Sequence, residues 1–229
     1  MKTFFDSEKA NSQPKSKSSV WFKSLFAIGL VFSLAIAMQA CKKDNVFNIS
    51  PDQTQDIKLE MRQLWAEHME WTYATVDAFF HDQNGLSAKL NRLLKNQTDI
   101  GEALVPYFGQ ENSQKLAGLL TEHIQGAVPV LSAAQNGDNA ALEQALDDWY
   151  ANAQEVGDHL AAINPEYWAQ PVLRDMWKTH ITQTVTYSVA LLQNELEKAV
   201  SDYQEAYNHM MGMGDIMSDG IIKKFPDKF

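Results

Sequence analysis

Cysteine is almost absent from this sequence of 229 residues, in which Cys41 is the only one. A single cysteine excludes a disulfide framework within the chain, and it excludes a zinc finger or an iron–sulfur cluster built on cysteines. Glycine and proline are also sparse, at 11 and 7 residues, which excludes collagen-like and low-complexity chains. With 45% hydrophobic and 21% charged residues, the composition is that of an ordinary globular protein.

Basic residues are outnumbered, with 19 Lys and Arg against 29 Asp and Glu, and the formal net charge is −10. Nucleic-acid binding needs clusters of Lys and Arg, so we expect no nucleic-acid partner. Motifs of several enzyme classes are missing too, among them His-Glu-x-x-His, Gly-x-Ser-x-Gly and the phosphate-binding loop. The sequence therefore favours a non-enzymatic role, although it leaves the question of activity open.

The N-terminal region has the layout of an export signal. Polar, lysine-dotted residues 1–24 precede an apolar run over 25–37, and the run leads into Met38-Gln39-Ala40-Cys41. As a helix this run is about 20 Å long, shorter than the bilayer core of about 30 Å. The motif resembles a bacterial lipobox, which implies cleavage before Cys41 and attachment of lipid to its sulfur. The alternative is an uncleaved membrane anchor with an incidental cysteine.

This resemblance implies an order of segments and a location. Residues 1–40 are expected to be a lipoprotein signal peptide, 41–55 the lipidated cysteine and a tether, and 56–229 a single domain. The membrane is then a partner through Cys41, and the protein is extracytoplasmic, with the outer membrane favoured and the leaflet left open.

Helical periodicity runs through the remainder of the chain. Apolar residues recur at steps of three and four, whereas the alternation typical of strands is missing. The predicted helices cover 55–82, 86–95, 99–108, 112–135, 139–162, 168–193 and 195–222, the last two either separate or continuous. The fold class is therefore all-α, an up-and-down bundle of four to five long helices with two short helices between the first and second.

Four histidines lie near the middles of predicted long helices, at His68, His123, His180 and His209. Mid-helix positions share one height in an up-and-down bundle, and apolar neighbours at steps of three, four and seven direct the first three toward the core. Neutral imidazole is a common ligand for zinc, iron and copper. The sequence thus predicts a layer of histidines inside the bundle.

This layer has two interpretations that the sequence leaves open. In the first it binds a divalent metal (zinc, iron or copper) or a haem-like cofactor, with Glu67 and Glu122 as supporting acceptors and Met213 as a possible soft ligand. In the second the histidines form a structural, hydrogen-bonded layer in a surface-tethered binding or scaffold module. His81 and His159 are expected at the surface and outside any site.

Three strings resemble an uncharacterised family of bacterial all-helical proteins. They are residues 64–72 (Leu-Trp-Ala-Glu-His-Met-Glu-Trp-Thr), 96–101 (Asn-Gln-Thr-Asp-Ile-Gly) and 220–226 (Gly-Ile-Ile-Lys-Lys-Phe-Pro). The resemblance covers about residues 60–229 and implies an all-helical fold. It supplies no activity and no catalytic residue.

Overall fold

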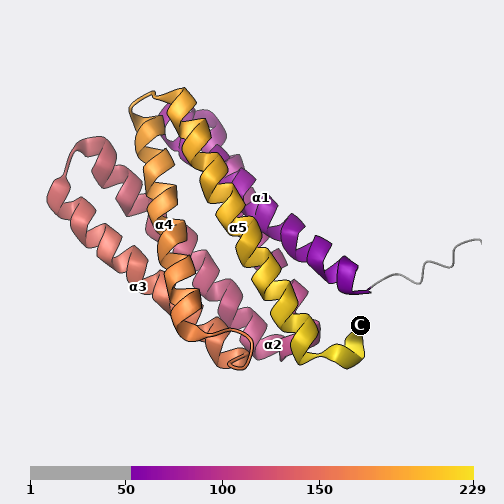
Figure 1. Cartoon of the computed structure of the whole chain (residues 1–229). Helices are drawn as coiled ribbons and strands as arrows, with labels where there is room; N and C mark the ends of the chain where they lie inside the picture. Colours follow the sequence, from indigo (N-terminus) through magenta and orange to yellow (C-terminus); the bar gives the residue numbers. More distant parts are fainter. Residues whose placement is uncertain (1–52) are drawn as a thin grey trace, which may run out of the picture. The chain divides into compact units, whose positions relative to one another are not determined.

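Helices make up nearly all of the chain that the computed structural model describes, which is residues 53–229 (Figure 1). Residues 1–52, including the predicted signal peptide, Cys41 and most of the tether, lie outside the described residues. Residues 53–229 contain no strand, and the predicted all-α bundle is confirmed. The elements are α1 (Gln53–His81), α2 (Gln83–Asn136), α3 (Asn139–Ile163), α4 (Gln170–Leu192), α5 (Leu196–Lys224) and the short 3-10 helix η1 (Pro226–Lys228).

The long helix α2 consists of two arms that fold back on each other at Gly109. This residue has φ 77° and ψ 167°, a conformation that favours glycine, and it ends the first arm where the sequence predicted a helix end. A Cβ placed on Gly101 would lie 2.8 Å from Cβ of Ala117. In a straight helix these two residues would be about 24 Å apart. Residues 83–108 and 110–136 therefore form a helical hairpin.

The first arm is one helix, and the prediction of two short helices over 86–95 and 99–108 is wrong in this respect. Residues 96–98 continue the helix, and Asn96 and Gln97 are buried inside the protein. Asn96 Nδ2 donates to the carbonyl oxygen of Leu64 at 3.0 Å, and Gln97 Nε2 donates to that of Leu93 at 2.8 Å. The side-chain NH2 groups of these two polar residues, which are typical of a loop, thus find acceptors in the protein interior.

Helices α4 and α5 are separate, which answers the question that the sequence left open. Gln193, Asn194 and Glu195 form the turn between them, and Asn194 has a positive φ of 59°. Asparagine tolerates this conformation better than most residues. The other reversals are short as well, with Asp82 between α1 and α2 and Gly137-Asp138 between α2 and α3.

Each helix packs against its neighbours in the chain, and α5 closes the bundle against α1. Since consecutive helical segments are antiparallel, α1, the second arm of α2 and α4 run in the same direction. Residues at matching distances along these three helices therefore lie at the same height. This arrangement brings the mid-helix histidines together.

Candidate functional site

Three of the four predicted histidines meet in the centre of the bundle. The ring of His180 on α4 lies 5.6 Å, centroid to centroid, from the rings of both His68 on α1 and His123 on α2. All three side chains are at most 1% exposed. Trp177 packs edge-on against His123 and His180 at 5.4 and 5.7 Å. We call His68, His123 and His180 the histidine cluster.

His209 does not join the histidine cluster, so the predicted four-residue layer contains three. Its side chain is only partly buried, and its Nε2 hydrogen-bonds the carbonyl oxygen of Met176 at 2.9 Å. The inward stripe of α5 runs instead through Ala206, Met210 and Met213. His209 is one residue before Met210, and it therefore points about 100° away from the core. Met213 is buried in the hydrophobic core.

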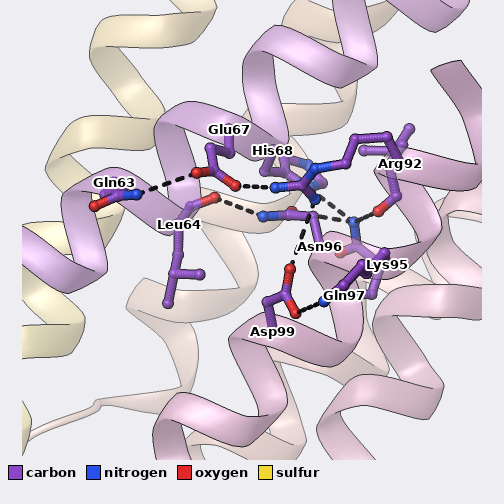
Figure 2. Close-up of polar contacts among 10 residues, drawn as sticks. Gln63, Leu64, Glu67, His68, Arg92, Lys95, Asn96, Gln97 and Asp99 are labelled. Carbon is purple, nitrogen blue, oxygen red and sulfur yellow. Dashed lines mark hydrogen bonds and ion pairs between the residues drawn. The ribbon is translucent and has the colours of Figure 1, made fainter.

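The two predicted supporting carboxylates also lie away from the imidazoles. Glu67 pairs with Arg92 and accepts a hydrogen bond from Gln63 Nε2 at 3.2 Å (Figure 2). Glu122 is exposed and lines a groove on the outer surface of α2 and α3. Each glutamate is adjacent in sequence to a histidine, and adjacent residues on a helix point about 100° apart. Amide side chains take the place expected for these carboxylates.

Gln97 on the first arm of α2 is the partner of His68. Its Nε2 lies 3.4 Å from Nδ1 of His68, and it also contacts Oδ1 of Asn96 at 3.3 Å (Figure 2). Nε2 of His68 is buried and has no hydrogen-bond partner among the described residues. Burial, reinforced by the nearby His123, lowers the pKa of His68 to about 3.

Asn152 on α3 is the partner of His123. Its Oδ1 lies 3.0 Å from Nδ1 of His123, while its Nδ2 donates to the carbonyl oxygen of Leu119 at 3.1 Å. Trp149 Nε1 donates to the carbonyl oxygen of His123 at 2.8 Å, which holds α2 and α3 together at this height. Burial lowers the pKa of His123 to about 4, so the ring is neutral at pH 7.

His180 has no hydrogen bond on its ring, and its Nδ1 is buried without a partner. Burial holds its pKa well below the usual 6.5, and the neighbouring His123 and His68 add to the effect. The histidine cluster is therefore an uncharged group of imidazoles. Within residues 53–229, three of its ring nitrogens are buried and unpaired.

The histidine cluster lies at one end of a largely apolar pocket of about 120 Å³. We call this cavity the histidine pocket. Its outer part reaches Val128, which is 42% exposed. Besides the histidines, its walls comprise Thr72, Thr75, Val76 and Phe79 from α1, Leu86, Leu90, Leu93, Ile124, Ala127, Val128 and Leu131 from α2, Trp149 from α3, and Thr184 and Ser188 from α4.

Thirteen buried side-chain polar atoms of the described residues lack a hydrogen-bond partner, and five of them belong to residues that line this pocket. In addition to the three imidazole nitrogens, the hydroxyls of Thr75 and Thr184 are buried without a hydrogen-bond partner in the described part of the chain. By contrast, Thr72 Oγ1 donates to the carbonyl oxygen of His68 at 2.6 Å, and Ser188 Oγ donates to that of Thr184, also at 2.6 Å. An unsatisfied buried group costs about 1–3 kcal/mol. Buried polar groups without partners in the walls of an apolar cavity are a feature of sites that take a ligand.

The polar wall of this pocket was not predicted from the sequence, although the sequence contains a signal for it. Thr72 and Thr75 follow His68 by four and seven residues, and Thr184 follows His180 by four. These spacings place the hydroxyl residues on the same inward stripe as the histidines. The side chains along two of these inward stripes also become smaller. Trp65 and Trp177 precede His68 and His180 by three residues, whereas Thr72 and Thr184 follow them by four.

The remaining histidines divide between the interior and the surface. His81 is exposed, as expected, and pairs with Asp77 at 2.9 Å. His159 was expected at the surface and is instead 6% exposed, which corrects that prediction. Its Nε2 hydrogen-bonds the carbonyl oxygen of Asn112 at 2.8 Å, just beyond the Gly109 reversal, and burial lowers its pKa. Only the folding back of α2 brings this second arm over His159.

Nowhere in residues 53–229 do three or more His, Cys, Asp or Glu side chains form a group arranged to hold a metal ion. None of the described helices is both long and apolar enough to cross a membrane. Comparisons with protein-family models, curated proteins and solved structures found no match. The function must therefore be argued from the geometry of the site.

Proposed function

We propose that this chain is a lipid-anchored, extracytoplasmic binding protein whose histidine pocket takes a small, uncharged and mostly apolar molecule. One observation carries the proposal: five buried polar atoms that have no hydrogen-bond partner within residues 53–229 belong to residues lining a single apolar cavity. Apolar walls with a few converging polar groups are the usual composition of a ligand site. A ligand with a polar end would recover hydrogen bonds that the protein alone leaves unmade.

The volume of the pocket limits the size of this ligand. At about 120 Å³ the pocket is slightly smaller than an engineered protein cavity of about 150 Å³ that binds benzene. A molecule with one ring or a short chain therefore matches the space. A haem-like cofactor, with four pyrrole rings in its macrocycle, is too large unless the helices move apart.

Charge limits the ligand as well. The imidazoles are neutral at pH 7, since burial lowers the pKa of His68 to about 3 and that of His123 to about 4. No Asp, Glu, Lys or Arg lines the pocket. A charged ligand would lose its hydration without gaining an opposite charge, which is costly.

A divalent metal ion (zinc, iron or copper) is the second candidate for the ligand of this pocket. The observation that favours it is His123, because Asn152 occupies Nδ1 and leaves Nε2 free to coordinate. The two ring separations of 5.6 Å would also suit imidazoles around one ion. The rings would have to turn, since the present arrangement of described side chains forms no metal site.

Calorimetric titration of the full chain with benzene and separately with zinc, ferrous and cupric ions distinguishes these candidates. Ala127 lines the pocket, so Ala127→Leu should fill it and abolish benzene binding. Ala140→Leu, at an exposed position on α3, is the matched control and should bind as the wild type does. Metal binding without benzene binding would favour the second candidate. Binding of neither would leave the structural histidine layer of a tethered module as the better account.

The anchoring part of the proposal concerns Cys41 and has its own test. Cys41→Ser removes the sulfur that would carry the lipid, and it lies outside the described helices. We expect the variant to leave the membrane fraction and still fold. Retention of the variant in the membrane, with no lipid label on the wild type, would contradict lipidation.

A further inference from the structure

The hydrogen bonds behind the histidine cluster determine which ring nitrogens carry protons. The geometry points to a specific ligand class: we infer that the histidine pocket recognises a neutral hydroxyl compound, a single-ring phenol or a short alcohol, and binds its hydroxyl at the histidine cluster, with His68 as donor and His123 as acceptor. This inference rests on the proposed function and adds the chemistry of the ligand to it.

His123 is an acceptor toward the pocket. The amide of Asn152 is oriented by its Nδ2, which donates to the carbonyl oxygen of Leu119 at 3.1 Å. Its Oδ1 therefore faces Nδ1 of His123 at 3.0 Å, and an oxygen can only accept there. The proton of the neutral ring accordingly resides on Nδ1. Nε2, which is buried and unpaired among the described residues, presents a lone pair.

His68 has the opposite polarity. Gln97 is oriented by its Nε2, which donates to the carbonyl oxygen of Leu93 at 2.8 Å. Its second hydrogen is shared between Asn96 Oδ1 at 3.3 Å and Nδ1 of His68 at 3.4 Å. Because an amide nitrogen only donates, Nδ1 of His68 is the acceptor and Nε2 carries the proton. Nε2 of His68 is thus an unpaired buried donor.

His68 as donor and His123 as acceptor, both in ring contact with His180, match a hydroxyl group, which accepts and donates through a single oxygen. The ligand oxygen would accept from His68, and its hydrogen would be donated to His123. A carboxylate cannot donate to His123, and it would bring a charge into an uncharged pocket. A hydrocarbon would fit the apolar walls but leave both nitrogens unpaired.

The preference is measurable as a ratio of dissociation constants for probes of one shape. Calorimetric titration of the full chain at pH 7 with phenol, benzene and benzoate should show phenol binding about 10- to 100-fold more tightly than benzene. Benzoate should bind more weakly than either. Equal binding of phenol and benzene, or tightest binding of benzoate, would overturn the inference while leaving the pocket intact. If no probe binds, the proposed function fails as well.

Two variants locate the hydroxyl. His68→Phe and His123→Phe keep an aromatic ring and remove the nitrogens, so each should bind phenol and benzene with similar affinity. His81→Phe changes an exposed histidine and should retain the wild-type ratio. A phenol preference that survives in both cluster variants would overturn the assignment.

Nitrogen-15 NMR of the wild type tests the tautomers without any ligand and does not depend on the variants folding. His123 should carry its proton on Nδ1 and His68 on Nε2. The reverse tautomer at either residue would overturn the inference.

Discussion

The two halves of the core on either side of the histidine cluster differ in the size of their side chains. In the half before the cluster, which we call the packed half, the fully buried Met61, Trp65, Leu120 and Trp177 fill the space. In the half after it, the pocket half, the same helices combine large apolar residues such as Phe79 and Leu131 with small or hydroxyl-bearing ones. The inward positions of the pocket half include Thr72, Thr75, Ala127, Thr184 and Ser188.

The difference between the two halves explains how a helical bundle leaves a cavity in its core. The helices need no break, since a reduction in side-chain size along three parallel stripes is enough to leave a cavity. The packed half keeps these helices in register while the pocket half remains incompletely filled. The proposed binding site and the most tightly packed core thus lie in different parts of the same helices.

Acid should have the largest effect, because it acts on the layer between the two halves. Below pH 6.5 the unfolded chain protonates its histidines, whereas folded His123 and His68 stay neutral down to about pH 4 and about pH 3. The free energy of unfolding is therefore highest above pH 6.5 and decreases as the pH falls. Each buried histidine contributes about 1 kcal/mol per pH unit. Urea unfolding should show a total loss of about 3–8 kcal/mol between pH 6.5 and 4.5.

Two variants connect this acid sensitivity to the histidine cluster. His123→Gln removes one titrating group and should reduce the pH dependence by about a third. His81→Gln, at the exposed end of α1, should leave it unchanged. Stability that does not vary between pH 6.5 and 4.5 would contradict burial of the cluster.

Truncation of a leucine to alanine should lower the free energy of unfolding more in the packed half than in the pocket half. Leu120→Ala leaves a new cavity among fully buried neighbours, and we expect the free energy of unfolding to fall by about 4 kcal/mol. Leu93 is also buried, but it already borders the pocket, so Leu93→Ala should cost about 2 kcal/mol. Urea denaturation measures both losses. Equal losses would mean that the two halves are packed equally well.

The contact between the arms of α2 should tolerate no added methyl group. Gly101→Ala would place its Cβ 2.8 Å from Ala117 Cβ and 2.9 Å from the Ser113 carbonyl oxygen, so the arms must separate. We expect a loss of about 1–3 kcal/mol in thermal or urea unfolding. Gly118 is exposed on the same helix with open space around its Cβ position. Gly118→Ala should instead stabilise by up to about 1 kcal/mol, and a similar gain at Gly101 would refute the close contact.

Substitution of two threonines in the pocket half should have the smallest effects on the free energy of unfolding, and the two effects should have opposite signs. Thr75→Val removes an unpaired buried hydroxyl and should stabilise the apoprotein by about 1 kcal/mol. Thr72→Val removes a hydroxyl that donates to the His68 carbonyl oxygen and should destabilise it by about 1 kcal/mol. Differential scanning calorimetry can resolve the pair. A loss at both positions would indicate that Thr75 is satisfied in solution.

Much of the architecture could be predicted from local patterns. The steps of three and four predicted helices throughout, and the gaps between the predicted helices 99–108, 112–135 and 139–162 coincide with two reversals of the chain. The same periodicity predicted that His68, His123 and His180 are buried. Local patterns wrongly predicted a break in the helix at residues 96–98. They could not show that Asn96 and Gln97 find hydrogen-bond partners on α1 and on the preceding helical turn.

The sequence by itself determined the helices, their turns and the inward aim of three histidines, since these follow from periodicity and from the conformational preferences of single residues. Only the tertiary structure decided that His209 lies outside the cluster, that His159 is buried, and that amides rather than Glu67 and Glu122 contact the imidazoles. The cavity beyond the cluster was decided there too. The physical reason is that burial, hydrogen bonding and unfilled volume depend on which side chains from distant segments meet, and a periodic pattern along one helix does not contain that information.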